Sequence, residues 1–211
     1  MIVAEADDDD FESLDLDDDK SPALSRDLAE ADDADDADEG DFDDDDLEDA
    51  EEDEIDYVIA SYREDGQVVV SALGKDLAND LDELIVQLRR LPGDAGAIGF
   101  VSLVEEVAVI VRVRGQHVQV LLSDAAAAAD WPIARDVADY LGEEIPDEED
   151  EEDAEPMGDL RILADLGVSE FDLTALCDDL DLSSEDLLAE VADKIKIGPQ
   201  FRRVAEAALS D

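Results

Sequence analysis

The fold of this chain is decided by the stretch AIGFVSLVEEVAVIVRVRGQHVQVLLS, residues 97–123. It contains three runs rich in β-branched residues, which are typical of strands: 97–104, 107–114 and 117–123. Only Glu105-Glu106 and Gly115-Gln116 separate the runs. Two residues are too few for a crossover between parallel strands. We therefore expect three neighbouring strands that run antiparallel.

The residues before this stretch predict a hairpin and a helix. DYVIASY (56–62) and QVVVSAL (67–73) predict two strands, with Glu64, Asp65 and Gly66 as turn residues between them. An amphipathic helix follows, with Asp76 as its expected N-cap and Pro92-Gly93 after its end. Its apolar face consists of Leu77, Leu81, Leu84, Ile85, Leu88 and Leu91.

The residues after the stretch predict further helical structure. Ser123 or Asp124 can cap a short Ala-rich helix that reaches Asp130, and Pro132 interrupts or restarts it with Asp130 as a second cap. The buried face would consist of Ile133, Val137, Tyr140 and Leu141. The order ββαβββα over residues 55–142 predicts an α+β domain: a five-stranded, mainly antiparallel sheet with helices on one face.

The C-terminal part predicts an acidic linker and a small helical bundle. Residues 143–155 contain 10 acidic residues and no basic one, so they form the linker. Residues 156–211 contain four short helical patterns, of which two begin with capping-box spacing: Ser169 to Asp172 and Ser183 to Asp186. The sequence leaves open whether this helical region packs on the sheet.

The N-terminal part is dominated by carboxylates. Residues 1–54 contain 29 acidic residues but only two basic ones, Lys20 and Arg26. Such a segment buries too little apolar surface to offset an ordering cost of about 1 to 2 kcal/mol per residue. We expect a disordered acidic extension. Its isolated Phe and Leu residues allow a partner-binding tail, but we favour a solubilising role.

The overall charge excludes several classes of function. The 211 residues include 66 Asp and Glu, 14 Lys and Arg and one His, which gives a formal net charge of -52. Direct binding of nucleic acid or of anionic lipid needs clustered Lys and Arg, so we expect neither. No run of 18 apolar residues and no secretory signal pattern occurs, and we expect a soluble cytoplasmic protein without contact to a membrane.

The residues that carry most enzyme chemistry are scarce. The chain has one His, His117, and one Cys, Cys177, whereas zinc sites usually use three or four such ligands. We expect His117 to lie on a strand surface and Cys177 to be a buried, inert thiol, because Asp178 and Asp179 would raise its pKa. We therefore identify no catalytic, cofactor-binding or metal-ligating residue and expect no cofactor.

Two basic residues on one strand are harder to interpret. Arg112 and Arg114 are two positions apart in VAVIVRVR, so they lie on the same face of the predicted strand. A local anion site is one interpretation. We favour a solvated strand face.

Two segments support a resemblance to a known family. They are VLLSDAAAAADWPIARDVADYLG and, after the acidic linker, PMGDLRILADLGVSEFDLTALCDDLDLSSEDLLAEVADKIKIGPQFRRVAEAAL. Over about residues 57–209 the chain resembles the actinobacterial tRNA adenosine deaminase-associated proteins, most closely in SDAAAAA and GDLRILADLG. The resemblance implies a cytoplasmic accessory protein with a link to tRNA editing, and it supplies no catalytic residues.

The chain is not itself a zinc deaminase of nucleobases. Those enzymes need a His or Cys ligand with a Glu two residues later, and a PCxxC pair. Val118 and Gln119 follow His117, and Cys177 has no second Cys.

Three functional hypotheses follow. We favour a non-catalytic accessory or regulatory protein whose acidic surface docks on a basic protein, with the tRNA adenosine deaminase as the candidate partner. The first alternative is an enzyme that uses carboxylates, with Arg112 or Arg114, on a small anionic or sugar substrate. The second alternative is an acidic mimic of nucleic acid.

Overall fold

The computed structural model describes residues 47–93, 96–146 and 155–210. Most of the expected acidic extension, residues 1–46, lies outside the described residues, and so do residues 147–154 of the expected linker. The Phe and Leu residues of the extension lie outside them too, with the exception of Leu47.

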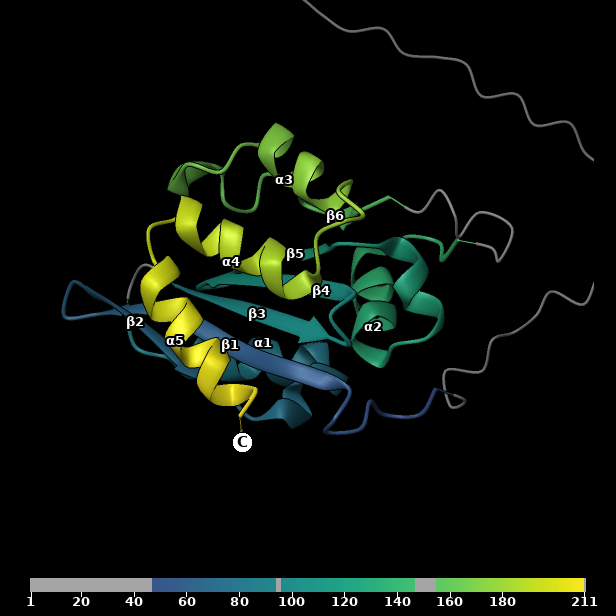
Figure 1. Ribbon diagram of the computed structural model, residues 1–211, viewed down its shortest axis with the longest axis horizontal. Coiled ribbons are helices and arrows are strands. Elements are labelled where there is room, and N and C mark those ends of the chain that lie inside the picture. Colours follow the sequence, from purple (N-terminus) through teal and green to yellow (C-terminus); the bar gives the residue numbers. More distant parts are fainter. Residues whose placement is uncertain (1–46, 94–95, 147–154, 211) are drawn as a thin grey trace, which may run out of the picture. The chain divides into compact units, whose positions relative to one another are not determined.

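The described residues form one antiparallel sheet of six strands in the order β2-β1-β3-β4-β5-β6 (Figure 1). The strands are β1 (Ile55–Glu64), β2 (Gln67–Ala72), β3 (Ala97–Leu103), β4 (Val107–Arg114), β5 (His117–Leu122) and β6 (Met157–Gly158). The α+β class and the antiparallel neighbours β3, β4 and β5 are confirmed. The expected number of five strands is wrong, because β6 adds a two-residue strand to β5. Two residues are too few to show the alternation by which a strand is predicted.

The β1–β2 hairpin has a two-residue turn. Glu64 pairs with Gln67, and Asp65 and Gly66 between them have φ angles of 53° and 79°. Two consecutive residues with positive φ are typical of the hairpin turn whose twist matches that of the strands.

One face of the sheet, which we call the first face, is covered by helices inserted between the strands. They are α1 (Leu81–Arg90), α2 (Pro132–Leu141) and the 3₁₀ helices η1 (Lys75–Asn79) and η2 (Ala125–Ala129). The core below them is apolar and includes Leu84, Val101, Val109 and Ile133.

The caps of these helices differ in part from the expected ones. Asp80, and not Asp76, caps α1, because residues 75–79 form η1 and the α-helix begins only at Leu81; Asp80 Oδ1 accepts a hydrogen bond of 2.7 Å from Glu83 N. Of the two caps expected for the Ala-rich helix, Ser123 and Asp124, the structure has Asp124, which caps η2. Trp131 stands at the N-cap of α2 in place of the expected Asp130, which ends η2.

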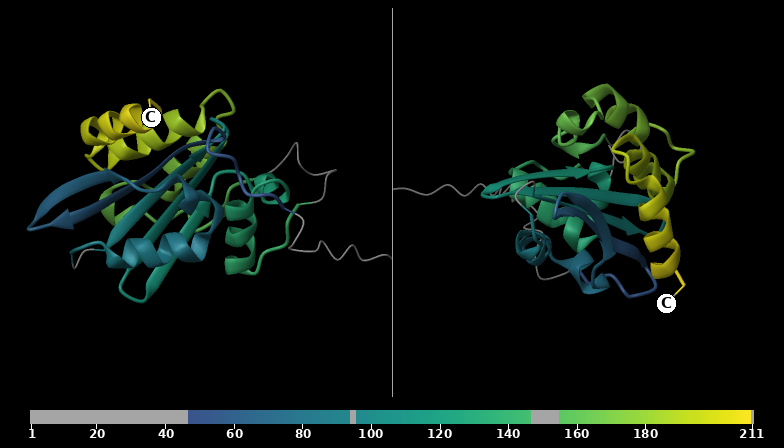
Figure 2. Two further views of the ribbon diagram at one scale, coloured as in Figure 1. Left: turned by 90° about the horizontal axis from the view of Figure 1, so that it is seen from below. Right: turned by 90° about the vertical axis from the view of Figure 1, so that its left-hand side faces the viewer.

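The opposite face, the second face, is covered by the C-terminal helices α3 (Glu170–Cys177), α4 (Ser184–Lys194) and α5 (Gly198–Ala208), together with the 3₁₀ helix η4 (Ala164–Leu166). In Figure 2 (left), α4 and α5 lie on one side of the strands and α1 on the other. The Phe201 ring is perpendicular to the rings of Tyr57 and Phe100, with centroid distances of 5.7 and 5.3 Å. The C-terminal region therefore shares a core with the sheet, which the sequence had left open.

Both predicted serine caps are present in this region. Ser169 and Asp172 form a reciprocal capping box at the start of α3. Ser183 Oγ accepts a hydrogen bond of 3.1 Å from Asp186 N at the start of α4.

The segment 47–54, which the charge pattern assigns to the extension, contacts the sheet domain. Ala50 is buried, its N–H donates to Asn79 Oδ1 (2.8 Å), and its carbonyl accepts from Asn79 Nδ2 (3.1 Å). The Glu54 carbonyl accepts a bond of 2.9 Å from Val104 N. These bonds join the acidic segment to η1 and to the end of β3.

Candidate functional site

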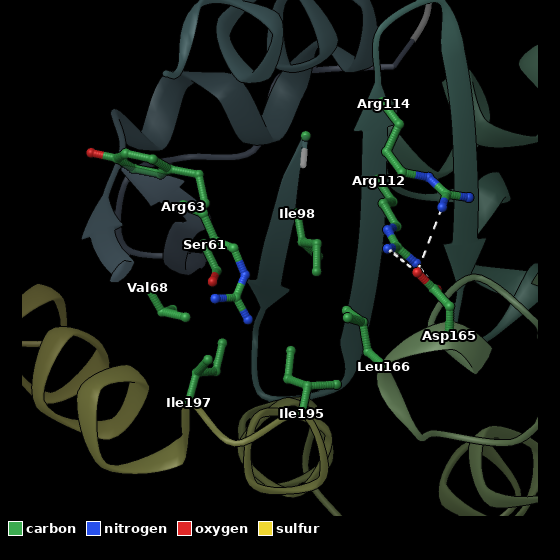
Figure 3. A pocket seen from close by; sticks show the side chains of 12 residues that line it. Ser61, Arg63, Val68, Ile98, Arg112, Arg114, Asp165, Leu166, Ile195 and Ile197 are labelled. Carbon is green, nitrogen blue, oxygen red and sulfur yellow. Dashed lines mark hydrogen bonds and ion pairs between the residues drawn. The ribbon is translucent and has the colours of Figure 1, made fainter. Parts of the chain in front are cut away.

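The second face contains a cavity of about 360 Å³ at the end where β1 and β4 finish. We call it the arginine pocket, because three arginines line it: Arg63, Arg112 and Arg114. Figure 3 shows Arg63 on one side of Ile98 and the other two arginines, with Asp165, on the opposite side. Pairing of neighbouring strands explains this row, since Ser61 of β1 is opposite Ile98 and Ile98 is opposite Arg112.

Arg112 is the buried member of the pocket, with only 5% of its side chain exposed. Its guanidinium donates two hydrogen bonds to the Asp165 carboxylate, of which the Nη2–Oδ2 bond is 2.8 Å, and a third of 2.6 Å to the Ile162 carbonyl. The favoured interpretation of a solvated strand face is therefore wrong for Arg112. The reason is the chain around η4, which folds over β4 and covers this residue.

Arg114 remains 41% exposed and completes the cationic side of the pocket. Its Nη1 lies 3.6 Å from Asp165 Oδ2, and its Nη2 donates to Gln119 Oε1 at 3.2 Å. Gln119 in turn donates to Asp159 Oδ2 at 2.6 Å. The Arg112 hydrogen bonds are the main reason that the pKa of Asp165 is lowered, so this carboxyl is ionised at neutral pH.

Arg63 is exposed, and sequence reasoning did not single it out. Its Nη1 donates a long bond of 3.5 Å to the Gly66 carbonyl. Alternation along β1 could have indicated it, since Arg63 shares a face with Tyr57, Ile59 and Ser61. Asp165 and Ile162 could not be found in this way, because they follow the linker and precede α3.

A second polar cluster fixes α4 on the sheet. Ser102 Oγ donates a bond of 2.8 Å to Asp56 Oδ2 and lies 2.7 Å from Ser184 Oγ. Both hydroxyls are buried. This arrangement satisfies groups that would otherwise be unpaired in the core, and we assign it a structural role.

On the side of α2, two shallow hollows form what we call the acidic surface. One, of about 520 Å³, contains Trp131, and the other, of about 400 Å³, contains Tyr140. Nine carboxylates line the two hollows: Glu48, Asp49, Glu51, Glu54, Asp80, Asp82, Asp130, Asp136 and Asp139. Among the described residues that line them, none is Lys or Arg.

Asp136 shows how crowded the acidic surface is. Its Oδ2 accepts a bond of 2.9 Å from Leu81 N, which favours the ionised form. Burial nevertheless raises its pKa, and the neighbouring charges of Asp80, Asp82 and Asp139 raise it further. Its ionised form is therefore less favourable in the folded protein than in the unfolded chain.

The His and the Cys lie apart from these surfaces. His117 is exposed at the start of β5, opposite Arg114 in register. Cys177 is half-buried at the end of α3, and burial, assisted by the charge of Asp178, raises its pKa to about 12. Within the described ranges no group of three or more His, Cys, Asp or Glu side chains is arranged to hold a metal ion.

None of the helices in the described part of the chain combines the length and the apolar character needed to cross a membrane.

Comparison with known proteins identifies relatives. The model of the family described as "Rv3753c-like tRNA adenosine deaminase-associated protein" matches residues 56–198. The chain is 35% identical over 150 residues to Protein Rv3753c of Mycobacterium tuberculosis (strain ATCC 25618 / H37Rv), an alignment that covers 70% of this chain and 86% of the relative. No solved structure matches the chain. The match begins at β1 and includes both surfaces described above except residues 48–54.

Proposed function

Since this chain belongs to the Rv3753c-like tRNA adenosine deaminase-associated protein family, we propose that it is a non-catalytic cytoplasmic accessory protein that binds the tRNA adenosine deaminase through its acidic surface. The observation that carries the proposal is the clustering of nine carboxylates around two hollows that Trp131 and Tyr140 line.

Repulsion among these carboxylates supports binding of a basic partner. The raised pKa of Asp136 reflects burial together with unneutralised charge from its neighbours. Lys or Arg side chains of a partner would relieve this repulsion and stabilise the ionised form. The acidic surface would therefore bind most tightly a protein with complementary basic residues.

The two aromatic residues supply a second kind of contact. Tyr140 is 48% exposed, so its expected place on the buried face of the helix is wrong. Trp131 is partly exposed at the other hollow. Guanidinium groups stack on aromatic faces, and Tyr and Trp are enriched among the residues that dominate binding energy at interfaces. An Arg-rich surface would find carboxylates and a stacking partner in the same hollow.

A protein surface that binds tRNA has to be basic, because it must neutralise phosphates. The acidic surface is complementary to the same side chains, so we propose that the chain and tRNA compete for the deaminase. Such an association would be fast and sensitive to salt, because long-range attraction accelerates encounter.

The test measures binding of the purified chain to the tRNA adenosine deaminase of the same organism by calorimetry, at low and at moderate salt. Reversal of two exposed charges, in Asp82→Lys with Asp139→Lys, should weaken binding at least about tenfold, since each partner charge loses an attraction and meets a repulsion. The matched control is Glu190→Lys with Glu206→Lys, which changes the net charge equally on α4 and α5.

The two double variants separate local docking from general attraction. Equal weakening by both would contradict a site at the acidic surface, and no binding of the unaltered chain at either salt concentration would remove the proposal altogether. In a further assay, added tRNA should displace the chain.

A further inference from the structure

We propose that the arginine pocket is a second binding site, which takes a small ligand that combines an oxyanion group, either phosphate or carboxylate, with an apolar body. This site is separate from the acidic surface and does not depend on the proposed interaction with the deaminase.

The first argument is the charge balance of the pocket. Three guanidinium groups line it together with a single carboxylate, that of Asp165. In the whole chain acidic residues outnumber basic ones by 66 to 14, so a local excess of positive charge is the reverse of what the composition favours. An anionic ligand would restore the balance.

The second argument is that the guanidiniums differ in their free hydrogen-bonding capacity. Arg112 is occupied by Asp165 and by the Ile162 carbonyl. Arg114 shares Asp165 with it at a longer distance. Arg63 makes one long bond to a backbone carbonyl, so most of its five N–H donors face solvent or the pocket. The oxyanion would therefore bind Arg63, the guanidinium with the most free donors.

Arg112 and Asp165 have a positioning role in this arrangement. Their paired hydrogen bonds hold the buried guanidinium against the sheet and keep the edge of η4 in place. The planar geometry of such a pair fixes orientation as well as energy. The pocket is thereby formed before a ligand binds.

The third argument is the apolar lining between the charged groups. Val68, Ile98, Leu166, Ile195 and Ile197 line the same cavity, and Figure 3 shows Ile98 between Arg63 and Arg112, with Leu166, Ile195 and Ile197 along one side. Fully hydrated anions such as inorganic phosphate gain little from such a wall. A ligand with a ring or a branched chain would bury apolar surface there.

The size of the cavity limits the ligand. Its volume of about 360 Å³ is near the lower end of the range for small-molecule pockets, roughly 300 to 1,000 Å³. One ring with one anionic group fits this space, whereas an extended polymer does not. Screening makes the site usable in an acidic chain, because charges beyond about 8 Å contribute little at physiological salt.

The experiment is a titration of the full chain, followed by amide NMR shifts, with four probes: phenyl phosphate, benzoate, inorganic phosphate and benzyl alcohol. We expect saturable shifts at Ser61, Ile98 and Leu166 with phenyl phosphate, benzoate or both, and at least about tenfold weaker binding of the two probes that lack one of the two features. The tighter of the two amphipathic probes identifies the preferred head group, and either order supports the site.

Two variants and one control assign the contacts. Arg63→Gln should weaken phenyl phosphate about tenfold, as expected for one lost charge-assisted hydrogen bond. Leu166→Ala should weaken the binding of phenyl phosphate but not the binding of inorganic phosphate. Arg203→Gln, an exposed arginine on α5, should change neither.

Either of two results would overturn the proposal. One is the absence of saturable shifts in the pocket with either amphipathic probe at concentrations up to about 10 mM, where even a millimolar Kd is detectable. The other is equal binding of phenyl phosphate by the unaltered chain and by Arg63→Gln.

Discussion

The two faces of the sheet are covered in different ways. The first face is covered by α1 and α2, which connect neighbouring strands in the chain, and its core is apolar from end to end. The second face is covered by helices that follow the last long strand. Besides an apolar core it contains the buried polar side chains of Ser61, Ser102 and Arg112.

This difference shows where the chain can form a ligand site. Helix α1 has to pack closely on the sheet, because its connection to β3 is short. The C-terminal helices arrive after the acidic linker and leave a cavity at one end of the second face, the arginine pocket. We therefore expect the two faces to differ in stability and in electrostatics.

The largest effect is expected from Phe201→Ala, which removes the ring that packs on Tyr57 and Phe100. The substitution should lower the free energy of unfolding by about 3 to 5 kcal/mol, as for other large buried aromatic residues. Chemical denaturation would measure it. The control is Phe171→Ala on α3, where the side chain is 82% exposed and a change within about 0.5 kcal/mol is expected. If Phe201→Ala were equally mild, the C-terminal helices would not share the core of the sheet.

The next effect concerns the buried ion pair of the second face. Arg112→Met keeps an unbranched apolar stem but removes the guanidinium and leaves the Ile162 carbonyl without its donor, which should cost about 1 to 3 kcal/mol at pH 7. The ion pair with Asp165 adds a second contribution that depends on pH. Because Arg112 lowers the pKa of Asp165, this second contribution is present above the ordinary carboxyl pKa and is lost as the pH falls through the lowered one.

Urea unfolding at pH 7 and in acid would follow this difference between Arg112→Met and the unaltered chain. The difference should shrink in acid, and a difference independent of pH would show that the ion pair does not contribute. Arg114→Met provides the half-exposed control.

A smaller effect is expected at the cap of α1 on the first face. Asp80→Ala removes the acceptor for Glu83 N and should lower stability by about 1 kcal/mol. Asp76→Ala should be nearly neutral, since Asp76 caps no α-helix in this fold. If Asp76→Ala lowered stability more than Asp80→Ala, Asp76 would be the cap, as expected from the sequence.

The smallest effect has the opposite sign. Asp136→Asn removes a carboxylate whose pKa is raised, keeps an oxygen that can accept from Leu81 N, and should increase the melting temperature by roughly 1 to 2 °C at pH 7. The gain should fade as the pH falls through the raised pKa, because the unaltered side chain is then protonated.

Asp172→Asn is the counterpart of this variant. Its carboxyl pKa is lowered to about 2 by Lys194 and Ser169, so this substitution should destabilise the protein. Thermal melts should show a higher melting temperature for Asp136→Asn and a lower one for Asp172→Asn. A change in the same direction for both variants would contradict this prediction.

The sequence predicted the elements that depend on local pattern. Alternating β-branched runs indicated β1 to β5, and serine with an acidic residue three positions later indicated the starts of α3 and α4. Asp76 was misassigned because a 3₁₀ turn and an α-helix can share one apolar stripe. Only the start of the helical backbone at Leu81 decides between Asp76 and Asp80.

The arginine pocket was beyond the reach of such patterns. Arg112 and Arg114 were recognised as neighbours on one face, but the partner of Arg112 lies 53 residues further along the chain. The residues of the pocket come from β1 to β4, η4 and the segment between α4 and α5. Contacts of this kind follow from how helices dock on a sheet, and no spacing in one sequence reveals them.

The position of β2 at the margin of the sheet has a consequence for solubility. Backbone N–H and C=O groups along its outer side have no neighbouring strand within the described residues, and such an edge can pair with the edge of another molecule. At neutral pH the formal charge of -52 keeps two copies apart. Near the isoelectric point, about 4.1, this protection disappears, and we expect precipitation through strand pairing at that acidity before the fold itself is lost.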